Sequence, residues 1–101
     1  MAEIEWTRPA FSNLERLPQV IAFEIVRRVD LLADFPESGA SLQSESPLLK
    51  PCRQLIIKRK YRVVYEFDEF ENTIYVLAVQ NCRQKLPSAR DLKRQMPTGD
   101  D

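Results

Sequence analysis

The sequence predicts one small α+β domain in which two antiparallel helices pack on one face of a four-stranded, mainly antiparallel, twisted sheet. Two patterns support this prediction. Residues 61–68 and 73–81 are rich in β-branched and aromatic side chains and are joined by a short acidic connection, which indicates a β-hairpin. Residues 21–33 instead place apolar side chains at helical spacing, in a stripe broad enough to cover a sheet. A chain of 101 residues is long enough to build one hydrophobic core.

The N-terminal third predicts a strand followed by two helices. Residues 2–6 alternate apolar and polar side chains, which is the period of a half-buried strand. Thr7 can cap a first helix, because its hydroxyl can accept a hydrogen bond from the first turn, where Pro9 is tolerated. Pro18 begins a second helix that we expect to run to about Phe35. The joint between the helices is short, so we expect them to be antiparallel neighbours.

The rest of the chain predicts a loop, three strands and a short helix. Residues 36–51 contain three prolines, one glycine and four serines, which predicts a loop. The strands are expected over about 52–58, 61–68 and 73–81. Ser88 and Asp91 have the spacing of a capping box, which predicts a short C-terminal helix. The order is therefore β-α-α-β-β-β with a final helix, in a single domain over 1–96 followed by a frayed tail over 97–101.

Composition indicates a globular protein without a membrane span or a metal site. The chain is 44% hydrophobic and 30% charged, and no apolar run approaches the roughly 20 residues that cross a bilayer. The N-terminus lacks the basic and apolar regions of a signal peptide, so the expected location is cytoplasmic. Cys52 and Cys82 are too few for a disulfide framework and fall on non-adjacent strands, so we expect two free thiols. Since the chain has no Cys/His cluster, no metal site is expected. No cofactor is expected either.

Charge is unevenly distributed along the chain, although the net charge is zero. Residues 50–62 hold six basic residues and no acid, residues 66–71 hold four acids and no base, and residues 83–94 hold five bases against one acid. The hairpin folds the two basic segments back together, which predicts an anion-binding edge at one end of the sheet. The alternative is that these charges are solvated polar faces of strands and of a terminal helix.

The expected hairpin register brings several arginines to one face of the sheet. Arg59–Lys60 is taken as the tip of the first hairpin, and residues 69–72 as the loop of the second. Because side chains alternate faces with period two, one face should then receive Arg53, Arg62, Arg83 and Asn81. Such a face could grip a phosphate or a carboxylate through bidentate guanidinium contacts. The alternative is that Arg53 pairs with Glu66 across the strands, while the other arginines cap solvent-exposed edges.

Several segments of the chain share their order and spacing with one known family. Ile4-Glu5-Trp6-Thr7, followed by Ala10-Phe11 and Leu14, is similar to the family's opening strand and first helix. Tyr61-Arg62-Val63-Val64-Tyr65 is similar to its central strand. Val76-Leu77-Ala78-Val79 with Arg83-Gln84 is similar to its last strand and basic end. Over nearly its whole length the chain thus resembles the RelE/ParE toxin superfamily of type II toxin–antitoxin systems, and within it the ParE-like plasmid-stabilisation toxins.

The resemblance implies a toxin that either cleaves mRNA on the ribosome or inhibits DNA gyrase. Family members of the first class use lysines or arginines on the sheet to stabilise phosphate, and a histidine, glutamate or tyrosine to transfer protons. By position, Arg62 matches the central-strand arginine and Arg83 the basic residue after the last strand. Arg53 falls where a catalytic base such as lysine often sits.

The chain departs from the endonuclease pattern in its proton-transfer groups. It has no histidine, so Asn81 stands where the family's histidine is common, and no tyrosine follows Arg83. The usual strand lysine has no counterpart unless Lys58 or Lys60 serves. Cleavage through a 2′-hydroxyl needs a base, an acid and a cationic clamp. The sequence offers the clamp, and Glu66 is the only carboxylate expected near it.

Three functions therefore remain open. The chain is expected to be a gyrase-inhibiting toxin, with a ribosome-dependent mRNA endonuclease as the alternative, and a degenerate member that keeps only antitoxin binding as a third possibility. As an endonuclease it would use as catalytic residues Arg62, Arg83, Arg53 and, more weakly, Glu66. The expected target- or phosphate-binding residues are Lys58, Lys60, Tyr61 and Asn81. Both toxin functions imply a cognate antitoxin that wraps a peptide across the helices and sheet. Its apolar contacts would come from Phe11, Leu14, Phe23 and Leu31.

Overall fold

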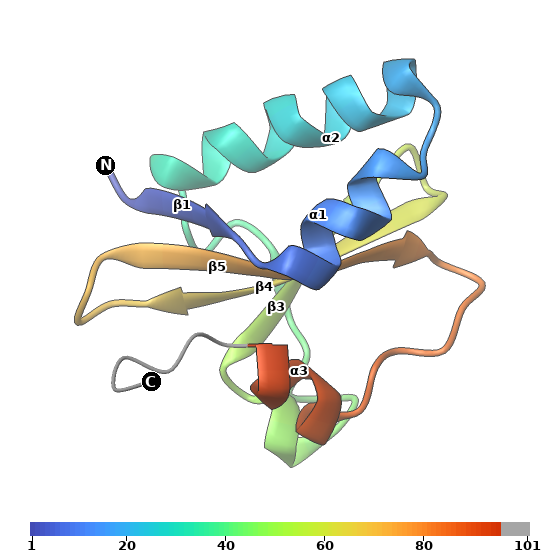
Figure 1. Ribbon diagram of the computed structural model, residues 1–101. Helices are drawn as coiled ribbons and strands as arrows, with labels where there is room; N and C mark the ends of the chain where they lie inside the picture. Colours follow the sequence, from blue (N-terminus) through green and yellow to red (C-terminus); the bar gives the residue numbers. More distant parts are fainter. Residues whose placement is uncertain (96–101) are drawn as a thin grey trace.

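Helices and strands follow the expected order along the chain (Figure 1). The structure is a computed structural model that describes the backbone of residues 1–95 and the side chains of residues 1–92, so the tail expected at 97–101 lies outside the described residues. Its strands are β1 (Glu3–Trp6), β2 (Ala40–Ser41), β3 (Cys52–Ile57), β4 (Tyr61–Asp68) and β5 (Thr73–Asn81). Its helices are α1 (Arg8–Glu15), α2 (Gln19–Asp30) and α3 (Ala89–Gln95), with short 3-10 turns at Leu31–Ala33 and Pro47–Leu49. Within residues 1–95, no helix is long and apolar enough to cross a membrane.

Side-chain caps begin the first and last helices where the sequence predicts. The hydroxyl of Thr7 accepts a hydrogen bond from the amide of Ala10 at 3.4 Å and donates one to the carbonyl of Val76 at 2.8 Å. Thr7 therefore both caps α1 and attaches it to β5. The hydroxyl of Ser88 accepts from the amide of Asp91 at 3.1 Å at the start of α3. The second helix is shorter than expected, because the chain tightens from α-helix to 3-10 turn after Asp30.

The described residues form a five-stranded sheet in the order β1-β5-β4-β3-β2, rather than the expected sheet of four strands. The N-terminal strand lies beside the last strand and runs parallel to it, while the other pairs are antiparallel. The additional strand is β2, which pairs with Arg53 and Gln54 inside the segment 36–51 that the sequence predicts to be a loop. Leu42 directly follows β2 and is fully buried, so an apolar anchor holds this short strand against β3.

Both faces of the sheet are covered by apolar packing. On one face, α1 and α2 contribute Ala10, Leu14, Ile25 and Val29, which pack against Ile57, Val63, Tyr65, Ile74, Val76 and Val79. On the other face, Leu92 of α3 joins Leu42 and Leu49 from the long loop, and together they pack against Cys52, Val64, Leu77 and Ala78. The sheet therefore has a separate apolar cluster on each face, and the strand register decides which cluster each strand residue joins.

The expected register of the first hairpin is wrong by one residue. The connection between β3 and β4 has three residues, 58–60, because Ile57 pairs with Tyr61. Arg53 consequently lies opposite Tyr65, whereas the expected two-residue tip would place it opposite Glu66. A one-residue slip moves a side chain to the other face of the sheet.

A β-bulge changes the register of the second hairpin. Asp68 pairs with Thr73, as the expected loop at 69–72 requires. The register then shifts between Val64 and Tyr65, where Leu77 is the extra residue on β5. Leu77 and Ala78 both pack on the α3 face as a result. Beyond the bulge Arg62 lies opposite Gln80, whereas an uninterrupted ladder from the Asp68–Thr73 pair would place it opposite Val79.

Candidate functional site

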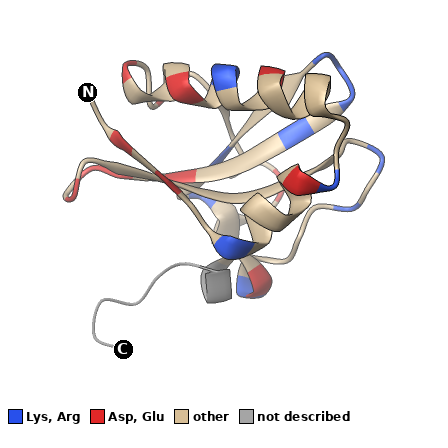
Figure 2. Ribbon diagram, turned by 45° about the horizontal axis from the view of Figure 1, so that its top comes forward, with Lys and Arg blue, Asp and Glu red and all other residues tan. Residues whose placement is uncertain are grey.

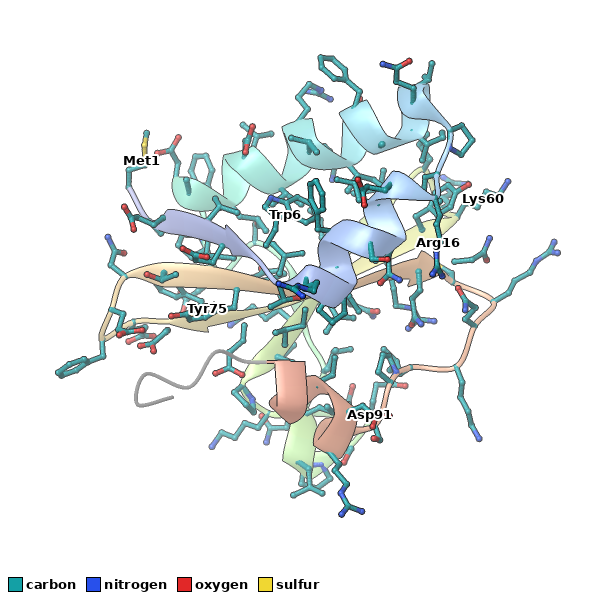
Figure 3. All side chains as sticks on the ribbon, in the orientation of Figure 1. Met1, Trp6, Arg16, Lys60, Tyr75 and Asp91 are labelled. Carbon is teal, nitrogen blue, oxygen red and sulfur yellow. The ribbon has the colours of Figure 1, made fainter. Side chains whose placement is uncertain are left out.

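Basic residues from two segments meet at one end of the sheet, and acidic residues lie toward the other end (Figure 2). The turn at 58–60 and the segment 82–85 are joined by a hydrogen bond from the amide of Cys82 to the carbonyl of Lys60, at 2.8 Å. The exposed basic side chains of these segments are Lys58, Arg59, Lys60, Arg83 and Lys85, and we call them the basic end. In Figure 3, Arg16 at the end of α1 lies toward the same side of the molecule as Lys60.

The turn that presents Lys58, Arg59 and Lys60 has an uncommon backbone. Lys58 and Arg59 both have positive φ angles, of 54° and 58°. The amide of Lys60 donates to the carbonyl of Ile57 at 3.1 Å and closes the turn. The ammonium group of Lys60 lies over the ring of Tyr61, 5.7 Å from its centroid.

The guanidinium group of the partly buried Arg62 makes three hydrogen bonds within the protein. Its Nη2 donates to the carbonyl of Cys82 at 2.8 Å and to that of Gln84 at 3.2 Å. Its Nη1 donates to the side-chain oxygen of Gln54 at 3.2 Å. Nε of Arg62 is buried and has no hydrogen-bond partner among the described residues. The central-strand arginine therefore holds the backbone of the segment that follows β5.

Side chains at the end of β5 complete the support of this segment. The side-chain oxygen of Asn81 accepts from the amide of Arg83 at 2.9 Å, and that of Gln84 accepts from the amide of Asn81 at 3.1 Å. The side-chain amide of Gln80 donates to the carbonyl of Lys85 at 3.3 Å. Four side chains, including that of Arg62, thus bind backbone groups of residues 81–85. The side chains of Arg83 and Lys85 remain exposed.

Arg53 lies on the opposite face of the sheet from Arg62, so the expected convergence of the two is wrong. Its Nη1 donates to the carbonyl of Gly39 at 2.7 Å and to that of Glu37 at 3.2 Å. Arg53 therefore holds the loop that leads into β2. Its position follows from the register, in which it pairs with Tyr65 on the side covered by α1 and α2.

Glu66 lies beside the buried thiol of Cys52, with which it pairs in the β3–β4 ladder. Burial, and then the negative charge of Glu66, raise the pKa of Cys52 to about 11. Cys52 is thus a neutral and poorly nucleophilic thiol at neutral pH. Both cysteines are free, as expected. Within the described part of the chain, no group of three or more histidine, cysteine, aspartate or glutamate side chains could hold a metal ion.

Sequence reasoning missed the polar side chains that organise the loops. The hydroxyl of Tyr65 donates to the carbonyl of Pro36 at 2.8 Å and accepts from the amide of Gly39 at 2.9 Å. Only its apolar packing was predictable, because the partners are backbone groups 26 and 29 residues away. The roles of Gln54 and Gln80 also depend on the register, since both pair across the strands with residues of β4. The sequence offered one signal for these roles, namely a polar glutamine inside a run of strand-forming residues.

Comparison with known proteins agrees with this architecture. A search of curated protein sequences gives no match. Among solved structures, the RelBE2 toxin–antitoxin complex of Mycobacterium tuberculosis matches with a TM-score of 0.69 and 24% identity over 79% of this chain and 96% of that chain. The isolated E. coli RelE toxin matches with a TM-score of 0.68 and 14% identity over 95% of this chain and 100% of that chain. At these identities the likeness establishes the fold.

Most of the sequence also matches the model of one protein family. Residues 4–86 match the family described as the ParE toxin of the type II toxin–antitoxin system parDE. This range runs from β1 through β5 and includes Arg62, Arg83 and the turn at 58–60. The chain therefore belongs to the ParE toxin family, within the RelE/ParE superfamily of type II toxin–antitoxin toxins.

Proposed function

We propose that this toxin arrests growth by binding DNA gyrase through its basic end, rather than by cleaving mRNA. The observation that supports this proposal most directly is that the guanidinium group of Arg62 is already hydrogen-bonded within the protein. Its guanidinium donates to two backbone carbonyls and one glutamine side chain, at 2.8 to 3.2 Å. An arginine bound in this way is poorly placed to stabilise the charge that develops on a phosphate during cleavage.

The remaining groups favour binding over catalysis. Arg53 holds backbone carbonyls on the opposite face of the sheet from Arg62, so the two guanidinium groups cannot act together. Arg83 and Lys85 are exposed cations that can attract an anionic target. Arginine deprotonates too poorly to act as a general base, and the chain has no histidine. A basic surface without a proton-transfer partner suits a binding inhibitor.

Two assays run side by side test the choice of target. The purified toxin is incubated with gyrase and relaxed plasmid DNA, and separately with programmed ribosomes whose mRNA is mapped by primer extension. We expect loss of supercoiling with intact mRNA. The double variant Arg83→Ala/Lys85→Ala should lose most of the inhibition, while Lys50→Ala, an exposed lysine outside the basic end, should keep it. Cleaved mRNA with normal supercoiling would instead establish the endonuclease alternative.

We also infer that a cognate antitoxin neutralises this chain by covering α2. The solved RelBE structures are complexes of a toxin with its antitoxin. On α2 and just beyond it, Val20, Phe23 and Leu31 are 77%, 76% and 49% exposed. Their spacing places them along one side of the helix, which suits an apolar peptide. Phe11 is 50% exposed and can extend this surface, whereas Leu14 is 8% exposed and belongs to the core.

Antitoxin binding can be tested with the product of the reading frame next to this gene. Phe23→Ala should weaken the complex at least tenfold, as expected for an aromatic residue at the centre of an interface. Phe70→Ala is the matched control, because Phe70 is 98% exposed but lies in the β4–β5 turn, away from α2. Equal affinities of the two variants would contradict the assignment of this surface. A chain that binds the antitoxin but does not slow growth would be a degenerate member of the family.

A further inference from the structure

In the turn between β3 and β4, two residues with long cationic side chains adopt a left-handed backbone conformation that is unfavourable for both. Positive φ angles at both central residues define the type I′ turn, whose usual sequence is Asn-Gly. Here the two positions hold Lys58 and Arg59, with φ angles of 54° and 58°. The left-handed conformation brings Cβ close to the following carbonyl, so a side-chain-bearing residue destabilises the turn.

The other hairpin of the chain follows the usual rule. In the β4–β5 turn the single residue with a positive φ angle is Asn72, at 52°, and asparagine tolerates this conformation. Asn72 also donates a side-chain hydrogen bond to the carbonyl of Met1 at 3.2 Å, so it contributes to the fold. Among the described hydrogen bonds and ion pairs, none involves the side chain of Lys58 or Arg59. Strain in a turn whose side chains make no hydrogen bond or ion pair with the described part of the fold points to a role outside the fold.

The surroundings of the turn indicate an anionic partner. Lys60, Arg83 and Lys85 are exposed next to it, and residues 50–65 contain no acidic residue. Lys58 contributes to lowering the pKa of one carboxyl group, that of Glu24 on α2. Glu24 is already paired with Arg27 at 2.8 Å, which is the leading cause of its lowered pKa. The charge of the turn is therefore available to another molecule.

The character of the exposed side chains favours the backbone of duplex nucleic acid. Protein partners are usually held by aromatic or apolar anchors, and the exposed side chains of the turn at 58–60 offer charge without such an anchor. Single strands are held by stacking bases on aromatic rings. The aromatic ring nearest in sequence is that of Tyr61, which is half-buried and carries the ammonium group of Lys60 on one face. Contacts made by charge alone are typical of phosphates in a duplex.

We propose that the Lys58–Arg59 turn contacts the phosphate backbone of duplex DNA, and that its charge is retained at the expense of stability. The inference extends the proposed function, because gyrase works on DNA and a toxin bound to it can touch the duplex as well. Binding of DNA by the toxin can be measured in the absence of gyrase. Gyrase inhibition and DNA binding can therefore be refuted independently of each other.

The test compares two double variants with opposite predicted effects on stability. Lys58→Asn/Arg59→Gly removes both charges and restores the usual type I′ sequence, so its Tm should rise by roughly 4 °C or more. Lys58→Gln/Arg59→Gln removes the same charges and keeps the unfavourable conformation, so its Tm should stay close to that of the original chain. Circular dichroism follows the melting of each protein.

Binding is followed by fluorescence anisotropy with a labelled duplex of about 20 base pairs at several salt concentrations. Both variants should bind more weakly than the original chain, with a log–log salt slope smaller by about 2, as expected for the loss of two phosphate contacts. Unchanged DNA affinity in both variants, or no binding of duplex by the original chain, would overturn the proposal. So would a Tm of the Asn-Gly variant that does not rise, or a clear preference for single-stranded RNA of the same length.

Discussion

Replacing Arg62 with methionine should loosen the segment after β5 while leaving the domain folded. Methionine keeps an apolar stem of similar length but removes the donors that reach Gln54, Cys82 and Gln84 at 2.8 to 3.2 Å. A hydrogen bond contributes roughly 0.5–1.5 kcal/mol net, so we assign about 1 kcal/mol to the shortest bond and about half of that to each of the others. Removing the buried Nε offsets part of the loss, because this group has no partner among the described residues.

The expected net loss of stability is therefore about 1–2 kcal/mol, which corresponds to a fall in Tm of roughly 4–16 °C for a domain of this size. Thermal denaturation measures this loss directly. Hydrogen exchange should locate it, since the amides of residues 82–85 should exchange faster while those of β4 and β5 keep their protection. Arg83→Met is the control, because an exposed side chain outside this network should change stability by less than about 0.5 kcal/mol.

A double-mutant cycle then separates positioning of the segment from direct contact with the target. If Arg62 acts by holding the segment that carries Arg83, the effect of Arg83→Met on gyrase inhibition should shrink in the Arg62→Met background. Two effects that simply add would mean that Arg62 touches the target itself. An Arg62→Met protein with the Tm and exchange rates of the original chain would refute the structural reasoning altogether.

Three further changes have clear expected outcomes. Gly39→Ala should destabilise the fold by about 1–3 kcal/mol in urea denaturation, because its Cβ would lie 2.6 Å from the hydroxyl of Tyr65; unchanged stability would contradict that packing. At pH 8 a thiol reagent should modify the partly exposed Cys82 and leave Cys52 unmodified until the protein unfolds, since burial raises the pKa of Cys52 to about 11. A hydrogen bond to a glutamate raises the pKa of Tyr75 to about 12, so its stabilising effect is complete below the ordinary value of 10.0 and is lost as pH rises through about 12. The Tyr75→Phe variant should not show this loss of stability at alkaline pH. If the variant and the original chain lose stability equally between pH 8 and 12, the hydrogen bond of Tyr75 does not have this effect.

Local rules predicted the elements of this fold because their causes are close in sequence. The strand at 73–81 is found at the expected bounds, and so is the strand at 61–68. Both depend on runs of β-branched and aromatic residues, which favour a pleated surface wherever the chain places them. The hydroxyls of Thr7 and Ser88 cap their helices as expected, since a cap acts within three residues. The family resemblance also follows from the order of these segments.

Side-chain placement at the site could not be predicted, because it depends on the register of two hairpins. One extra turn residue at 58–60 moved Arg53 to the opposite face, and the bulge at Leu77 moved the partner of Arg62 from Val79 to Gln80. A slip of one residue changes the face of every following side chain, whereas the hydrophobic pattern of these strands tolerates either register since both faces are covered. The sequence alone thus determined that basic residues gather at one end of an α+β domain. Only the tertiary structure decided which of them hold the backbone and which remain exposed, because the carbonyls that bind Arg53 and Arg62 come from segments 14 to 22 residues away.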